Sequence, residues 1–375
     1  MRALFVLSLL LLMGCAHKTS PSVRPDLTVD QVEPLFPPKI SDTEGWARDL
    51  ILALRTNGLP VDLEHACSVI AIAEQESGVQ ANPIVSGLPV IARESLAEKA
   101  KALGSFGSMV LSKLLEGKAP GTSKTFDQRI DTLKTEADLD LLFRDILADH
   151  QRRSPVLYDL ANVGATLFSS GSLEDRNPVT TAGSMQVSVR FSEEHARRLR
   201  RDASVVRDEL YTRAGGLLYG SARLWSFDAA YDSMRYRFAD YNAGAFTSRN
   251  AAFQDQLGAL VKVSLALDGD LLSYDAAGDV KSADTKSMAA LEQFAEGKRL
   301  NVERDAKKEK RRDFENTATW EAVKAATEKK TGRAAAYARL PDVTLKSPKI
   351  KRQLTTAWFA QAVDRRYQSC LSRAK

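Results

Sequence analysis

Apolar residues recur at spacings of three and four along most of this 375-residue chain, and that period predicts helices. One such run begins after Asp42, the expected N-cap, and continues to Gly58. Its apolar residues are Trp46, Leu50, Ala53 and Leu54. Strand-like alternation is scarce. The pattern therefore predicts an all-α fold, α+β at most, with room for one small hairpin.

A second helix is expected directly after the first, opened by Pro60 and apolar in nearly every turn up to Ala73. Glu76 falls at its C-terminal end, where burial and the negative end of the helix dipole both disfavour a carboxylate. We therefore expect a raised pKa for Glu76. Glu74 points to a different face of the helix and is expected in solvent.

The N-terminus predicts export. Residues 1–14 combine a basic Arg2 with an apolar run too short to span a membrane, and are expected to be a signal peptide. Leu12-Met13-Gly14-Cys15 resembles a bacterial lipobox, which makes Cys15 the expected mature N-terminus, carrying acyl chains such as palmitate. The residue that follows it, Ala16, suggests an outer-membrane lipoprotein that faces the periplasm. An ordinary secretory signal or a short uncleaved anchor remains the alternative.

Charge and side-chain chemistry exclude several classes of function. The formal net charge is +5, or +4 without Arg2, and basic residues alternate with acidic ones, so no nucleic-acid partner is expected. The histidines, at positions 17, 65, 150 and 195, show no metal-ligand spacing, and neither a phosphate-binding glycine loop nor a nucleophile elbow is present. We expect neither a metal nor a cofactor.

Two cysteines remain once Cys15 is assigned to lipid. In an oxidising compartment Cys67 and Cys370 can form one disulfide between the C-terminal tail and the helix of Glu76. Two separate buried thiols are the alternative, because cysteine is among the most buried residue types.

Three short motifs stand in a fixed order: Glu76-Ser77 at a helix end, Gly183-Ser184-Met185-Gln186, and Tyr241-Asn242-Ala243-Gly244. Together they resemble the catalytic motifs of lytic transglycosylases and the related G-type lysozymes. The resemblance covers roughly residues 42–256. It implies a lysozyme-like fold and a glycan-binding cleft. Ser184 stands where the family prefers leucine, which puts the exact shape of that cleft in doubt.

Composition, apolar pattern and this resemblance together divide the chain into domains. We expect a flexible tether over residues 15–40, a lysozyme-like domain over 41–274, and a charged helical C-terminal extension over 275–375. The family has a short loop between its first two motifs, whereas here about residues 84–179 form an insertion with mostly helical periodicity. This insertion could form a wall or a lid over the cleft. An apolar stripe from Leu354 to Leu371 is expected to dock on the protein itself.

Carried over to this sequence, the resemblance implies a lyase acting on peptidoglycan glycan strands. Glu76 would protonate the β-1,4 oxygen between N-acetylmuramic acid and N-acetylglucosamine, then act as base while the substrate's 6-hydroxyl closes a 1,6-anhydro ring. Five further residues would support the reaction. Ser77 would steady Glu76 or the acetamido group, Met185 and Gln186 would line the sugar subsites, Tyr241 would place its phenol near Glu76, and Asn242 would fix the loop or contact substrate.

Two other functions remain open. Lysozyme-type hydrolysis needs a second carboxylate, for which Asp240, Asp175 and Glu174 are the candidates. A non-catalytic, peptidoglycan-binding scaffold lipoprotein would keep the cleft without turnover, and the large insertion makes such a divergence credible. Protein partners are not indicated by the sequence.

Overall fold

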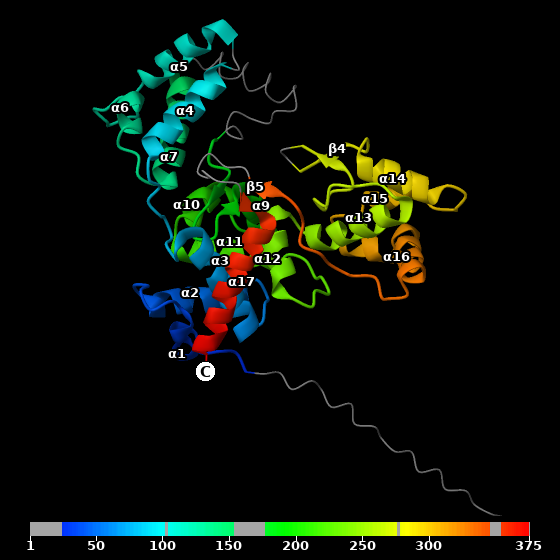
Figure 1. Cartoon of the computed structure of the whole chain (residues 1–375). Coiled ribbons are helices and arrows are strands. Elements are labelled where there is room, and N and C mark those ends of the chain that lie inside the picture. Colours follow the sequence, from blue (N-terminus) through cyan, green and yellow to red (C-terminus); the bar gives the residue numbers. More distant parts are fainter. Residues whose placement is uncertain (1–24, 102–103, 154–176, 276–277, 346–353, 375) are drawn as a thin grey trace, which may run out of the picture.

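The computed structural model describes residues 25–101, 104–153, 177–275, 278–345 and 354–374. Helices make up 61% of the structure and strands 4%, which confirms the all-α expectation. The described residues form a main unit, an insertion above it and a C-terminal unit to one side, each with its own apolar core (Figure 1).

The main unit is built from helices around one two-stranded hairpin. Its elements are α1 (Val29–Val32), η1 (Glu33–Leu35), α2 (Thr43–Thr56), α3 (Leu63–Ser77), β1 (Thr181–Ala182), β2 (Val187–Ser188), α9 (Val189–Arg198), η4 (Ala203–Val205), α10 (Val206–Leu210), α11 (Arg213–Leu224), α12 (Met234–Ala243) and α17 (Thr356–Arg373). The hairpin is antiparallel, with Thr181 opposite Ser188 and Ala182 opposite Val187.

Capping residues determine where the first two long helices begin and end. The Asp42 carboxylate accepts a hydrogen bond from Gly45 N at the start of α2, as expected. The cap of α3 is Asp62, which accepts from His65 N at 2.9 Å, so the expected start at Pro60 is wrong. Gly78, at φ 64°, ends α3 in the left-handed conformation that glycine adopts without steric cost. The side chains of residues 66–73 are buried.

The segment before α2 is more ordered than a tether. Val32 and Leu35 are fully buried and Phe36 is 3% exposed, all within the main core. Pro34 lies in the first turn of η1, where proline fits because its missing N–H is not needed. The Arg373 guanidinium at the end of α17 donates to Leu35 O at 2.8 Å. The expectation of a flexible tether up to residue 40 is therefore wrong for residues 29–36.

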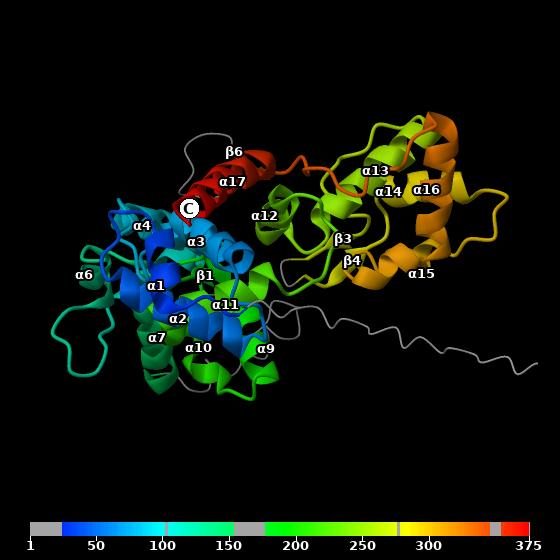
Figure 2. The same ribbon diagram turned by 90° about the horizontal axis from the view of Figure 1, so that it is seen from below.

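Helix α17 follows the C-terminal unit along the chain but packs in the main core. Figures 1 and 2 both show it lying beside α3 and α12. Its apolar stripe buries Phe359, Val363 and Tyr367, and a disulfide joins Cys370 to Cys67 of α3 with a Cα–Cα distance of 5.5 Å. The sequence left open whether these cysteines form a disulfide or remain two separate buried thiols, and the structure has the disulfide.

The described part of the insertion packs four α-helices and a 3₁₀ turn around a small core that includes Leu88, Phe126 and Ile130. Its neck is closed where Ile84 pairs with Thr135 and Val85 N donates to Lys134 O at 2.8 Å. The elements are α4 (Leu88–Lys101), η2 (Gly104–Phe106), α5 (Gly107–Leu115), α6 (Phe126–Ile130) and α7 (Glu136–Arg153).

The C-terminal unit has a core around Phe253, Leu291, Phe314 and Trp320. Because Phe253 lies on α13, the boundary expected at residue 274 falls inside this unit. Its elements are α13 (Thr247–Val261), β3 (Ser273–Tyr274), β4 (Val280–Ser282), α14 (Lys286–Ala295), α15 (Val302–Ala306), η5 (Arg312–Asn316) and α16 (Ala318–Thr331). Strand β5 (Thr344–Leu345) then pairs with β6 (Leu354–Thr355), which leads into α17.

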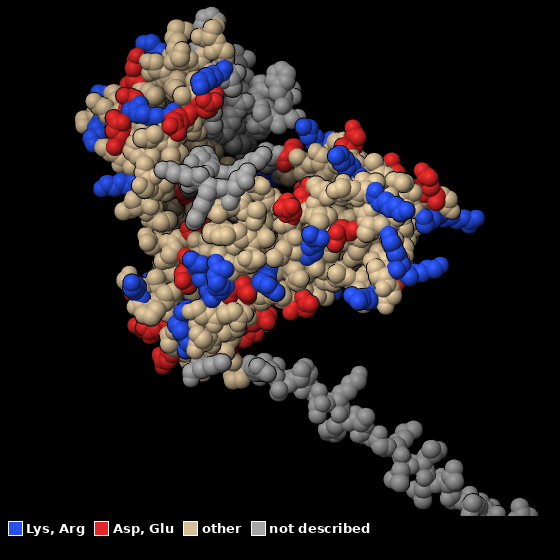
Figure 3. Space-filling model, viewed as in Figure 1, with Lys and Arg blue, Asp and Glu red and all other residues tan. Residues whose placement is uncertain are grey.

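Acidic and basic side chains are interspersed over the visible face of the main unit and the insertion, and Lys and Arg gather at the outer end of the C-terminal unit (Figure 3). Among the described residues no helix is both long and apolar enough to cross a membrane.

Candidate active site

The three motifs come from distant parts of the chain and meet in the main unit. The Tyr241 hydroxyl on α12 donates to Met185 O in the β1–β2 turn at 2.7 Å. Burial raises the pKa of Tyr241, and the negative charge of Glu76 raises it further, so this phenol lies within electrostatic reach of Glu76. The fold thus joins the second and third motifs directly, and the Glu76 charge acts on the phenol that joins them.

Glu76 occupies the last turn of α3 and is half-buried. The turns before it are fully buried, so the helix presents this carboxyl at the edge of the main core. Glu74, expected in solvent, is instead partly buried against α17, where Arg366 Nε lies 3.6 Å from its carboxylate. That contact exists because α17 returns to the main unit, which no local pattern shows.

The Ser77 hydroxyl serves the end of the helix. It donates to Ala73 O at 3.0 Å and accepts from Gln80 N at 3.0 Å. A hydroxyl has one proton to donate, so in this arrangement Ser77 can offer a ligand only its remaining lone pair.

Met185 was expected to line a sugar subsite. It is fully buried, so its side chain instead belongs to the core. It packs against α11 at Gly220, where an added Cβ would lie 2.1 Å from its sulfur. Gly183, at φ 80°, is similarly constrained, because a Cβ there would lie 2.2 Å from Leu210 O. Met185 contributes its carbonyl group, which fixes Tyr241.

Both ends of the Gln186 side-chain amide are hydrogen-bonded within the chain. It sits at φ 48°, an uncommon conformation for a residue other than glycine. Its Nε2 donates to Glu136 Oε2 at 2.8 Å and, more weakly, to Gly183 O at 3.4 Å. Its Oε1 accepts from the Thr181 hydroxyl at 3.1 Å. The amide that should bind sugar is therefore oriented by the protein, and chiefly by Glu136.

Glu136 was not anticipated. It is the first residue of α7 in the insertion and is 7% exposed. The sequence around Glu136 is that of an ordinary helix start and gives no sign of a role at the site. Only the docking of α7 against the hairpin reveals that role. Arg223 of α11 was also missed, and its positive charge opposes the rise in the pKa of Tyr241.

Asn242 is exposed, and its Oδ1 accepts from the Thr356 hydroxyl at the start of α17 at 3.3 Å. The contact links the third motif to the C-terminal helix. This position is compatible with both expected roles, loop support and ligand contact.

Asp240 does not face the site. It is fully buried, where its carboxylate accepts from the Tyr231 hydroxyl at 2.5 Å and from Ser248 N at 2.7 Å. Burial raises its pKa to about 6, although these hydrogen bonds oppose the rise. Asp240 thus joins α12 to α13 and is unsuited to activate water. The other two candidates, Glu174 and Asp175, lie outside the described residues.

No group of residues that could hold a metal ion occurs in the described part of the chain. His65 Nδ1 contacts the carboxylate of Asp62 at 2.8 Å, and His195 Nε2 contacts Asn57 Oδ1 at 2.8 Å. These two histidines therefore serve structural contacts. Cys15, like His17, lies outside the described residues.

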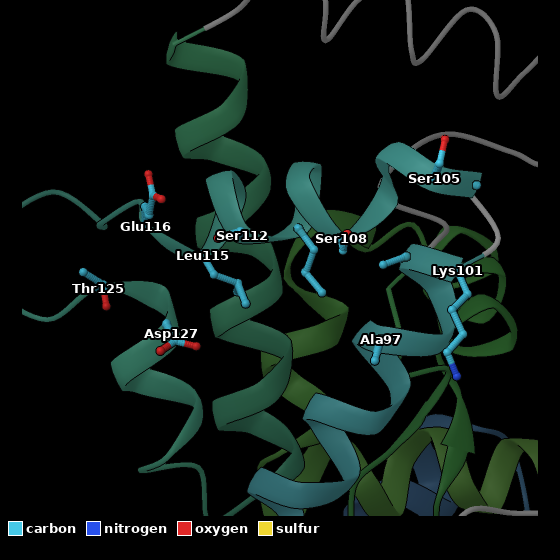
Figure 4. Close-up of a pocket in the computed structure, with 12 residues that line it drawn as sticks. Ala97, Lys101, Ser105, Ser108, Ser112, Leu115, Glu116, Thr125 and Asp127 are labelled. Carbon is cyan, nitrogen blue, oxygen red and sulfur yellow. The ribbon is translucent and has the colours of Figure 1, made fainter.

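A cavity of about 780 Å³ lies in the insertion, apart from Glu76. Figure 4 shows that its walls come from α4, η2, α5 and the start of α6. Small and apolar side chains such as Ala97, Ser108 and Leu115 line it.

Comparison with known proteins places the whole chain in one family. Residues 39–373 match the family described as "Protein of unknown function (DUF1615)". The chain is 36% identical over 378 residues to "Uncharacterized protein YaiW" of Escherichia coli (strain K12), covering 99% of this chain and 98% of that protein. No solved structure matches it. This protein therefore belongs to the DUF1615 family.

Proposed function

We propose that this protein is a lytic transglycosylase that cleaves the β-1,4 bond between N-acetylmuramic acid and N-acetylglucosamine in peptidoglycan. The observation that carries the proposal is the hydrogen bond from Tyr241 to Met185 O, which joins the second and third motifs, together with the effect of the Glu76 charge on the same phenol. A chance match of short motifs has no reason to bring them together in space.

In the proposed mechanism Glu76 first donates its proton to the glycosidic oxygen. The carboxylate formed then takes the proton of the substrate's own 6-hydroxyl as that oxygen attacks the anomeric carbon and closes the 1,6-anhydro ring. One carboxyl group is enough, since no water is activated. Asp240, buried in the α12–α13 contact, takes no part.

We also propose attachment to the outer membrane through lipid on Cys15, with the protein facing the periplasm. The Cys67–Cys370 disulfide supports an oxidising compartment, because such bridges are rare in the cytosol. A lipid anchor would keep the enzyme beside its polymeric substrate.

The test is digestion of purified peptidoglycan by a soluble form that begins at residue 16, followed by mass spectrometry of the released muropeptides. We expect 1,6-anhydro products, reduced by about 10²- to 10⁴-fold in Glu76→Gln, the usual range for loss of a general acid-base group. Glu64→Gln, an exposed residue on the same helix, is the matched control and should retain activity. Products with reducing ends would instead show hydrolysis.

A peptidoglycan-binding scaffold without turnover is the second candidate. The observation that favours it is the occupation of both Gln186 and Ser77 by partners within the chain. Binding of peptidoglycan without release of any muropeptide by the wild-type protein would establish the scaffold and overturn the lyase.

A further inference from the structure

The insertion is joined to the main unit by an ionic cluster around one buried carboxylate. Asp140 of α7 is fully buried and accepts from Asn177 Nδ2 at 2.6 Å and from Arg207 Nη1 of α10 at 2.9 Å. Arg144 Nε lies 3.0 Å from the second carboxylate oxygen, and the same guanidinium pairs with Asp208 at 2.6 Å. Breaking a buried pair leaves an uncompensated charge, so this cluster holds α7 in one position.

That position brings Glu136 to the hairpin. Glu136 and Asp140 are four residues apart and share one face of α7, so the buried cluster sets the place of Glu136 one turn away. The resulting contact with Gln186 Nε2, at 2.8 Å, is the direct link between the insertion and the second motif.

A carboxylate can only accept hydrogen bonds, and this fixes which way the Gln186 amide points. The nitrogen must face Glu136, which leaves the oxygen toward the Thr181 hydroxyl. An amide oxygen has two lone pairs, and Thr181 uses one of them. Gln186 is half-buried, so the second lone pair is the group it can offer a ligand.

We propose that Glu136 is a positioning residue of the sugar site, through which the insertion sets the polarity of Gln186. Gln186 then accepts a hydrogen bond from a donor on the glycan, a hydroxyl or an acetamido N–H. This inference rests on the proposed function and deepens it: the insertion forms part of the glycan site.

The test measures binding and turnover separately. Binding of soluble N-acetylglucosamine tetramer is measured by calorimetry in the Glu76→Gln background, and KM and kcat are measured with soluble glycan strands. Glu136→Gln keeps the size of the side chain but lets the Gln186 amide take either orientation. We expect a rise in Kd and KM of about three- to tenfold, the usual effect of one misplaced hydrogen bond, with little change in kcat.

Three further variants separate positioning from folding. Glu98→Gln removes an exposed insertion carboxylate that pairs with Lys101, and should change nothing. Thr181→Val removes the other partner of the amide at an exposed position, and should weaken binding in the same direction. In the Gln186→Ala background Glu136→Gln should have no further effect, because its influence acts through that amide.

The two proposals fail in different ways. If Glu76→Gln does not bind the tetramer and the wild type does not cleave strands, the proposed function is wrong and this inference falls with it. If Glu76→Gln binds but adding Glu136→Gln leaves binding equally strong, or if Glu136→Gln adds its full effect to Gln186→Ala, only the positioning role is wrong. An unchanged melting temperature in Glu136→Gln would show that its effect on KM is not a loss of fold.

Discussion

The main core and the core of the C-terminal unit are both helical, yet different interactions organise them. The main core combines apolar faces with close backbone contacts at glycines, the Cys67–Cys370 disulfide closes it, and its buried charges, Arg237 and Asp240, lie on the one helix α12. In the C-terminal unit buried charges link the elements. The fully buried Arg249 donates to Glu309 O and Arg311 O, and the Glu309 carboxylate accepts from two backbone N–H groups and from Tyr274.

This difference shows which interactions select the folded structure of each unit. Apolar packing tolerates exchange of similar side chains, whereas a buried charge is costly unless every partner is present. The unit that holds the motifs is thus the more predictable one, and the C-terminal unit depends on particular polar residues. Asp240 lies where the two units meet, since it binds Ser248 N at the start of α13.

The largest effect should come from breaking the disulfide of the main unit. The bridge spans 303 residues, and the chain-entropy model gives about 6 kcal/mol for so long a loop. Cys67→Ala with Cys370→Ala should lower the melting temperature of the main unit far more than that of the C-terminal unit, as measured by calorimetry. Reduction of the wild type is the control and should give a similar shift. An equal fall in both transitions would show that the units unfold together.

The next effect should come from the buried arginine of the C-terminal unit. Arg249→Leu removes a buried cationic partner of Glu315 and takes one donor from each of the Glu309 and Arg311 carbonyls. We expect a loss of about 3–5 kcal/mol, the usual cost of breaking a buried pair. Urea unfolding followed by tryptophan fluorescence measures it, because Trp320 packs in this core.

Arg339→Leu is the matched control for this change. Its guanidinium pairs with Asp255 at 2.9 Å on the surface of the same unit, and exposed pairs contribute less than about 1 kcal/mol. If both variants lose the same stability, the buried network does not have the role described above.

The smallest effect should be at the junction and should depend on pH. Burial raises the pKa of Asp240 from 3.8 to about 6, so the folded protein binds this proton more tightly than the unfolded chain. The corresponding stability is complete below about pH 4 and is lost as the pH rises through about 6. The wild type loses this stability as the pH rises from about 4 to above 6, whereas Asp240→Asn does not. The free energy of unfolding of Asp240→Asn should therefore rise relative to that of wild type by up to about 3 kcal/mol over this pH range, since one pKa unit is about 1.4 kcal/mol.

Urea unfolding at a series of pH values checks this prediction. Asp228→Asn is the control, because its carboxylate pairs with Arg312 near the same junction but is 89% exposed. Parallel curves for wild type and Asp240→Asn would contradict the assignment of a raised pKa.

Much of the fold could be read from local patterns. The caps, the apolar stripes and Gly78 act over one or two turns, so they predicted α2, the end of α3 and the stripe of α17. Prediction failed where long-range contacts decide. Val32 and Phe36 are buried in a segment that was taken for a tether, and Met185 is buried although its motif suggested a binding surface.

The sequence by itself determined the helical class, the caps, and the placing of Glu76 at the end of an apolar helix, because these depend on interactions between near neighbours. Only the tertiary structure decided that Tyr241 would bind Met185 O, that α17 would close the main core, and that Glu136 would orient Gln186. Each of these contacts joins segments more than 40 residues apart, and no local free energy favours one such pairing over another until the units have packed.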